Sequence, residues 1–138
     1  MKYLFLFGFL ICSISLSAQV QEENRIFNSV LQGGEQLEIG DKSIRFKEVV
    51  SDSRCPKDVT CVWAGEAKVL IEIFENGKLL NKKLVVINPY GIDEIPVQFS
   101  GGGGIYSITV FKLFPYPSSA SKKDAIDYTL EMQVSENL

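Results

Sequence analysis

Hydrophobic and polar residues alternate along most of the chain from residue 36 onwards, and this period of two is typical of β-strands with one buried face. Strands are predicted at 36–39, 42–47, 67–75, 78–87, 97–99, 105–114 and 126–134. No stretch shows a convincing pattern of an amphipathic helix. The pattern therefore predicts an all-β fold, a single antiparallel β-sandwich or small barrel of six to seven strands, and the spacing does not decide between the two.

The first two strands form a predicted hairpin around Gly40-Asp41, a two-residue turn that needs glycine at its first position. This turn places Leu37 opposite Ile44, so that the apolar residues share one side. The alternation then slips at 48–50, where we expect a β-bulge.

A second hairpin is predicted at Asn76-Gly77, which is the strongest short hairpin signal in the chain. A simple register across this turn places Ile73 opposite Leu80. Further along, the strand at 105–114 is apolar on both faces, which predicts a central position in a sheet. Its alternation places Tyr106 and Ile108 on one face, and Phe111 and Leu113 on the other.

The N-terminal residues have the composition of a secretory signal peptide. Lys2 supplies the positive charge, an apolar run extends to Ile14, and small residues precede a cleavage point after Ala18. The run is too short for a membrane-spanning helix, which needs about 20 apolar residues. Cys12 follows the large residues at 9–11, and this argues against lipid anchoring.

We therefore expect a signal peptide at 1–18, an N-terminal extension at 19–34 and a β-sandwich domain at 35–138. The few large apolar residues of the extension fit a short helix, a loosely docked strand or a frayed terminus equally well. The protein is expected to be secreted or periplasmic after removal of the signal peptide, with no membrane span.

Cys55 and Cys61 are the cysteines that follow the signal peptide, and an exported protein meets an oxidising compartment. Catalytic dithiols are usually separated by two residues, whereas these two are separated by the longer segment 56–60. The pair therefore predicts a structural disulfide, whose short ring stabilises the fold by about 2 kcal/mol.

The chain has no histidine, and its 17 acidic residues outnumber its 14 basic residues. Without histidine, Ser-His-Asp and Cys-His sites are excluded, together with the usual nitrogen ligand of zinc and copper. The absence of a basic cluster argues against nucleic-acid binding. Carboxylate pairs such as Asp52 with Asp58, or Asp93 with Glu94, stay open as acid–base candidates. The sequence favours a non-enzymatic protein without a cofactor or a metal.

The stretch at 51–66 separates the two hairpins and contains the only tryptophan of the chain. It is predicted to be either a pinned crossover or a rigid loop offered to a partner. Arg54 is expected to pair with Asp52 or to stack on the indole of Trp63. Trp63 is expected to lie over the disulfide and to close one end of the core. The candidate partner-binding residues are Asp52, Arg54, Lys57, Asp58 and Trp63.

The leading functional hypothesis is an exported non-enzymatic domain, binding or structural, whose partner is a protein or a glycan in the cell envelope or outside the cell. An alternative is inhibition of a secreted hydrolase, a lysozyme or a protease, through the loop between Cys55 and Cys61. In that case Lys57 and Asp58, at the apex of the ring, would enter the active site.

A third hypothesis is a calcium-dependent or carbohydrate-binding module. Calcium binds several oxygen ligands, and Asp52 and Asp58 would contribute carboxylates. A sugar-stacking platform would combine four aromatic residues, although such residues more often close a small core. These four residues are Trp63, Tyr90, Tyr106 and Tyr116.

The motif D-S-R-C-P-x4-C-x-W-A-G, which runs from Asp52 to Gly65, resembles a domain of small exported bacterial proteins. Many of those proteins are described as hypothetical proteins or lipoproteins. The resemblance covers roughly residues 35–134, and it is specific in the motif and generic in the flanking strands. It implies export, a bridge between Cys55 and Cys61 and one β domain, and it carries no activity.

Overall fold

The computed structural model describes residues 24–89, 91–92, 97–101, 104–120 and 127–137. These residues form nine strands and no helix, so none of them forms a helix that could cross a membrane. The predicted signal peptide lies outside the described residues. The strands are β1 (Arg25–Gln32), β2 (Gln36–Ile39), β3 (Lys42–Asp52), β4 (Ala67–Glu75), β5 (Lys78–Asn88), β6 (Gly91–Ile92), β7 (Val97–Gly101), β8 (Gly104–Phe114) and β9 (Thr129–Asn137).

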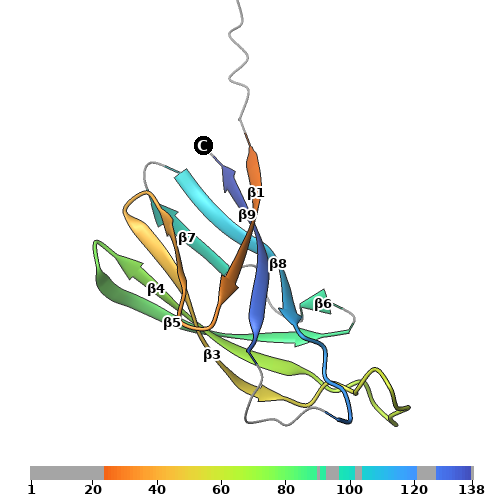
Figure 1. The fold of residues 1–138 in the computed structure, drawn as a ribbon. Helices are drawn as coiled ribbons and strands as arrows, with labels where there is room; N and C mark the ends of the chain where they lie inside the picture. The colour runs from red at the N-terminus through yellow and green to blue at the C-terminus, as the bar shows by residue number, and fades with distance from the viewer. Residues whose placement is uncertain (1–23, 90, 93–96, 102–103, 121–126, 138) are drawn as a thin grey trace, which may run out of the picture.

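Two antiparallel sheets form the molecule (Figure 1). One sheet has four strands in the order β1-β9-β8-β7, and the other has five in the order β2-β3-β4-β5-β6. Because the strands belong to two separate sheets, the fold is a sandwich and not a closed barrel. The predicted all-β sandwich is therefore confirmed, with nine strands in the described ranges instead of the six to seven expected. The sequence pattern did not predict β6, and it left β1 open as one of three alternatives.

The core lies between the sheets and draws equally on both. Each sheet supplies four of the largest fully buried side chains, which alternate along their strands with more exposed residues. These side chains are Ile44, Phe46, Val69 and Ile71 from the five-stranded sheet, and Ile108, Leu130, Met132 and Val134 from the four-stranded sheet.

The segment before β2 is a strand, one of the three alternatives that the sequence left open. β1 pairs with β9 along its whole length, from Arg25 opposite Glu136 to Gln32 opposite Thr129. Leu31 of this strand is buried in the common core. The segment from Arg25 onwards is thus part of the sandwich.

The hairpin of β2 and β3 has the predicted register, with Leu37 opposite Ile44. The expected slip in β3 is confirmed, and it consists of two register shifts against β4. One lies between Phe46 and Glu48, and the other lies between Val49 and Ser51. These irregularities bend β3 as it approaches the loop that follows it.

The hairpin of β4 and β5 has the predicted turn, and Asn76 has a positive φ of 48°. Its predicted register is wrong beyond the turn, because a shift between Ile73 and Phe74 places Ile73 opposite Asn81 rather than Leu80. The shift turns Val85 and Ile87 of β5 towards the core, while Leu80 stays exposed.

β8 lies between β7 and β9, so its predicted central position is confirmed. The prediction that its apolar residues divide between two faces is wrong. A register shift between Ile108 and Val110 reverses the alternation at this point. Ile108, Phe111 and Leu113 are consequently all buried, together with Tyr106.

Candidate functional site

The segment 53–66, which we call the disulfide loop, connects β3 to β4 and projects from one end of the sandwich (Figure 1). The predicted bridge between Cys55 and Cys61 is present. The loop lies beside the segment that follows β8, where the amide of Lys57 donates a hydrogen bond to the carbonyl oxygen of Pro117 at 3.1 Å.

The two ends of the disulfide loop continue the ladder of β3 and β4. The amide of Ser53 donates to the carbonyl of Glu66 at 2.8 Å, and the amide of Cys55 donates to the carbonyl of Ala64 at 2.8 Å. Gly65 has a φ of +70°, and a Cβ atom at this position would lie 1.8 Å from the carbonyl oxygen of Ser53. Only glycine fits this close approach.

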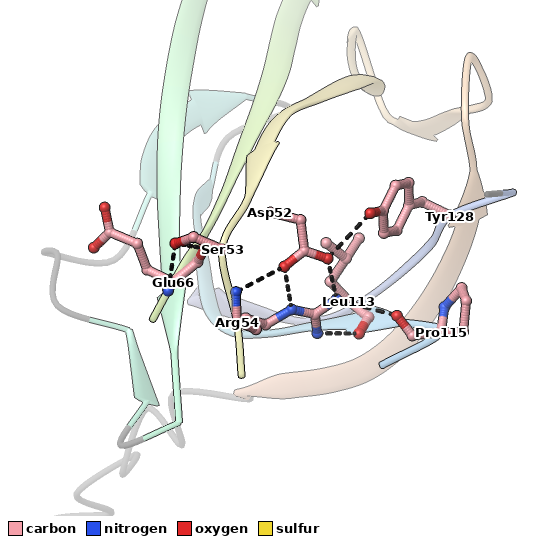
Figure 2. A network of polar contacts seen from close by, with 7 residues as sticks. All are labelled: Asp52, Ser53, Arg54, Glu66, Leu113, Pro115 and Tyr128. Atoms are coloured by element: carbon pink, nitrogen blue, oxygen red, sulfur yellow. Dashed lines mark hydrogen bonds and ion pairs between the residues drawn. The ribbon is translucent and has the colours of Figure 1, made fainter. Parts of the chain in front are cut away.

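Arg54 fixes the loop to the end of β8 (Figure 2). Arg54 is only 5% exposed. Its guanidinium pairs with Asp52 through two hydrogen bonds, from Nε to Oδ1 at 2.9 Å and from Nη2 to Oδ2 at 2.7 Å. Nη1 donates to the carbonyl of Leu113 at 2.8 Å, and Nη2 donates to that of Pro115 at 3.1 Å. The predicted pairing of Arg54 with Asp52 is confirmed, and the pair joins the loop to the four-stranded sheet.

The carboxylate of Asp52 is fully engaged in this network. Besides the guanidinium, Oδ1 accepts the amide of Arg54 at 3.2 Å and Oδ2 accepts the hydroxyl of Tyr128 at 3.0 Å. Burial alone would raise the pKa of Asp52, but the hydrogen bonds and charge of Arg54, with the bond from Tyr128, hold this pKa below its ordinary value. These four accepted bonds match the roughly four lone-pair positions of a carboxylate, so the Asp52 oxygens are engaged within the fold.

Trp63 faces solvent with 82% of its surface exposed, so the expectation that it closes the core is wrong. The expected stacking of Arg54 on this indole is also wrong, because the guanidinium carbon lies 4.7 Å from the ring centre of Tyr116 instead. Val62 beside Trp63 is fully exposed, and Val59 is 47% exposed. We call Val59, Val62 and Trp63 the apolar tip.

Lys57 and Asp58 lie on the side of the loop that faces 117–119. Asp58 is exposed and accepts hydrogen bonds from the amide of Ser119, at 2.9 Å, and from its hydroxyl. These bonds lower the pKa of Asp58. The side chain of Asp58 thus holds the loop in place, while Lys57 is exposed to solvent.

The structure therefore separates the five candidate residues into three positions. Asp52 and Arg54 form the buried pair, Lys57 and Asp58 lie beside the neighbouring segment, and Trp63 points outwards. Sequence reasoning missed Val59 and Val62 as members of an exposed surface, and Tyr128 as a partner of Asp52. An available signal was the position of the two valines within or beside a short disulfide ring, where a side chain is too tightly tethered to reach a core.

The proposed sugar-stacking platform does not form among the described residues. Tyr106 is buried, lies 5.4 Å from the ring of Phe99 and donates its hydroxyl to Glu136 at 2.8 Å. The Tyr106 ring therefore belongs to the core and is not available for stacking on a sugar. Tyr90 lies outside the described residues.

No three Asp, Glu, His or Cys side chains in the described ranges are grouped so that they could hold a metal ion. Asp93 and Glu94, the other candidate acid pair, lie outside the described ranges.

Comparison with known proteins finds no matching family model, no matching curated protein and no matching solved structure. Function is accordingly argued from the geometry of the site.

Proposed function

We propose that this protein is an exported, non-enzymatic domain that binds a protein partner through the apolar tip. One observation carries the proposal, namely the 82% exposure of Trp63 on a loop that a disulfide and a buried ion pair hold in place. Tryptophan is enriched among the residues that dominate protein–protein binding energies. An exposed indole beside Val62 is an apolar surface that a partner would remove from water.

The construction of the loop supports binding because it is ordered before any partner arrives. The ring between Cys55 and Cys61 restricts the backbone, and the Arg54 network fixes the base of the loop to β8. A loop that is already rigid loses little conformational entropy when it is bound, so more of the contact energy appears as affinity.

Export and the lack of catalysis rest on separate support. A disulfide of this kind persists in oxidising compartments, and the N-terminal sequence has the composition of a signal peptide. The chain has no histidine, and the carboxylate of Asp52 is consumed by its hydrogen bonds. A binding role needs none of these groups as reactants.

Affinity capture tests the proposal with matched surfaces. Wild-type protein and the variant Trp63→Ser are immobilised and exposed to an envelope and culture-medium extract of the source organism. Each retained protein is then purified and titrated against both forms. We expect a partner that binds the wild type and binds the variant at least about tenfold more weakly, as for a tryptophan hot spot. Equal binding to both forms, or no partner specific to the wild type, would contradict the proposal.

A second candidate, inhibition of a secreted lysozyme or protease, is favoured by the projection of the loop from the end of the sandwich (Figure 1). Such a shape suits entry into an active-site cleft. Inhibition by the wild type is compared with that by Trp63→Ser and by the double variant Lys57→Ala with Asp58→Ala. Inhibition that falls with either change supports this candidate, and a panel of enzymes that all stay active contradicts it.

A further inference from the structure

β5 is open along most of its outer edge. β6 pairs only with its last two residues, Ile87 and Asn88. Along Lys78–Val86, β5 has β4 as a neighbour on one side and, within the described ranges, no strand on the other. Figure 1 shows the turn of the β4–β5 hairpin at the opposite side of the molecule from the disulfide loop. The N–H and C=O groups along an open edge form a template for a further strand.

The backbone of this edge can accept such a strand at little cost. From Asn81 to Val86 its ladder with β4 is regular, so the edge amides and carbonyls alternate as in an ordinary strand. Outside that ladder, the backbone of this segment makes one hydrogen bond to a described residue, from the amide of Lys82 to Oδ1 of Asn81 at 2.8 Å. An incoming strand therefore replaces one bond between neighbours and adds a ladder of its own.

The outer face of this edge is apolar. Residues directly opposite each other in an antiparallel pair share one face of the sheet. Leu79 and Leu84 lie opposite apolar residues of β4, on the face that points away from the core. Lys82 lies on the same face, where its Nζ pairs with Glu72 at 3.2 Å. The leucines are therefore the side chains that this face offers to a neighbouring strand.

The other face of the same segment is cationic. Lys78, Asn81 and Lys83 alternate with the outer residues and lie on the side of the sheet that faces the core further along the strand. All three are exposed, so the four-stranded sheet does not cover this part of β5. No described carboxylate lies within ion-pair distance of Lys78 or Lys83. Two lysines on this face are thus available to acidic groups of a partner.

Protection against association does not by itself account for this edge. Lysines and a bulge commonly protect edge strands, and β5 has both. Yet Leu79, Leu80 and Leu84 are between 43% and 54% exposed along the same edge, which protection does not require. A second copy of β5 would bring lysines against lysines, and like charges on paired strands are unfavourable. The complement of this edge is a strand with apolar side chains on one face and carboxylates on the other, which means that the two kinds alternate.

We propose that the open edge of β5 binds an extended segment of another protein in which acidic and apolar residues alternate. The backbone of that segment continues the five-stranded sheet from Asn81 to Val86. Its apolar side chains lie beside Leu84, and its carboxylates lie beside Lys83. In such strand additions the main-chain bonds give affinity and the alternate side chains give specificity. This surface is separate from the apolar tip, because the hairpin turn and the disulfide loop lie at opposite ends of β4.

Titration of the ¹⁵N-labelled protein with the capped heptapeptide EVEVEVE tests the surface. We expect saturable binding of one peptide, with amide shifts concentrated in 79–86 and slower hydrogen exchange in this range. The peptide KVKVKVK should bind at least about tenfold more weakly because its charge is reversed. EVEPEVE should also bind at least about tenfold more weakly, because proline has no N–H and interrupts the ladder. Anionic lipid vesicles, which carry negative charge without a strand, should not displace EVEVEVE.

A charge-reversal pair tests the contribution of the cationic face. Lys83→Glu should weaken the binding of EVEVEVE about three- to tenfold. Lys47→Glu makes the same charge change at an exposed lysine of β3, which does not neighbour β5, and it should leave the affinity unchanged. The proposal is overturned if EVEVEVE does not bind, if the three peptides bind equally, if vesicles displace it, or if the shifts lie outside β5. It is also overturned if the protein alone shows these shifts on concentration, or if both lysine variants behave alike.

Discussion

The base and the tip of the disulfide loop show opposite uses of polar and apolar residues. At the base, the charged side chains of Asp52 and Arg54 are 8% and 4% exposed. At the tip, Val62 and Trp63 lie almost wholly in solvent. The charged residues hold the fold together and the apolar residues are available for contact, which is the reverse of the usual division between core and surface.

The comparison also shows how a loop is fixed without a core of its own. Arg54 donates to the carbonyl of Leu113 within β8 and to that of Pro115 in the bend that follows, and Asp52 orients the guanidinium for these bonds. A side chain with several donors in a fixed fork can join three segments at once. The tip then needs no apolar contact with the sandwich to keep its position.

Removal of Arg54 is expected to have the largest effect, because it leaves Asp52 buried without its counter-ion. Arg54→Ala should lower the free energy of unfolding by about 3–5 kcal/mol, measured by urea denaturation. Arg45→Ala is the matched control, since Arg45 also lies over an aromatic ring, that of Phe74, but its side chain is 35% exposed. Its buried partner Glu72 also keeps a second cation, Lys82 at 3.2 Å. The control should lose about 1 kcal/mol or less. Equal losses would show that the base is not a buried anchor.

Gly65 is expected to be the next most sensitive position of the base. Gly65→Ala should lower the free energy of unfolding by about 3 kcal/mol, because the new Cβ meets the carbonyl of Ser53 and the backbone is left-handed. Gly77 has a similar φ of +78°, and a Cβ atom there would have no other atom within 4 Å. Gly77→Ala therefore measures the cost of the left-handed backbone alone, about 1 kcal/mol. Thermal unfolding of both variants measures the difference, and identical shifts would refute the close approach.

Loss of the disulfide should have an intermediate effect on stability. The double variant Cys55→Ser with Cys61→Ser is expected to lose about 2 kcal/mol, since the ring is short. The Arg54 network should survive, because its partners lie outside the ring. Amide hydrogen exchange checks this division, with faster exchange in 56–63 and unchanged protection in β3 and β4. Faster exchange throughout β3 would mean that the disulfide, and not Arg54, fixes the base.

Tyr128 should make the smallest contribution to the base. Tyr128→Phe removes one hydrogen bond to Asp52 and should lower the free energy of unfolding by about 1 kcal/mol at neutral pH. Burial, followed by the charge of Asp52 and the hydrogen bond to it, raises the pKa of Tyr128 above 10.0. A raised pKa gives stability that is present below pH 10.0 and lost as the pH rises through the folded value. The difference between wild type and variant should therefore shrink in alkaline urea titrations, and a constant difference would argue against this bond.

Sequence alternation predicted most strands, the turn residues predicted both hairpin turns, and the cysteine pair predicted the disulfide, because each of these depends on neighbouring residues. It did not predict the register shifts near Ile73 and Ile108, where one additional residue reverses the faces of the rest of the strand. Apolar residues on both sides of such a shift look like two faces in the sequence, although they share one face in the fold.

The site was predictable in part for the same reason. The pairing of Arg54 with Asp52 is local, and it was expected from the sequence. The carbonyls that complete the anchor belong to Leu113 and Pro115, more than fifty residues away in the chain, and main-chain acceptors leave no signature in a sequence. Trp63 was expected to lie over the disulfide and to close one end of the core, and only the structure shows that the loop turns it outwards.

The fluorescence of Trp63 tests the contrast between base and tip most directly, since this is the only tryptophan in the chain. We predict that emission from the native protein has nearly the same maximum as emission in concentrated guanidinium chloride, and that acrylamide quenches both states almost equally. The emission should move to shorter wavelength only when a partner covers the tip. A native spectrum that is already blue-shifted and protected from acrylamide would place Trp63 in the core and contradict the account.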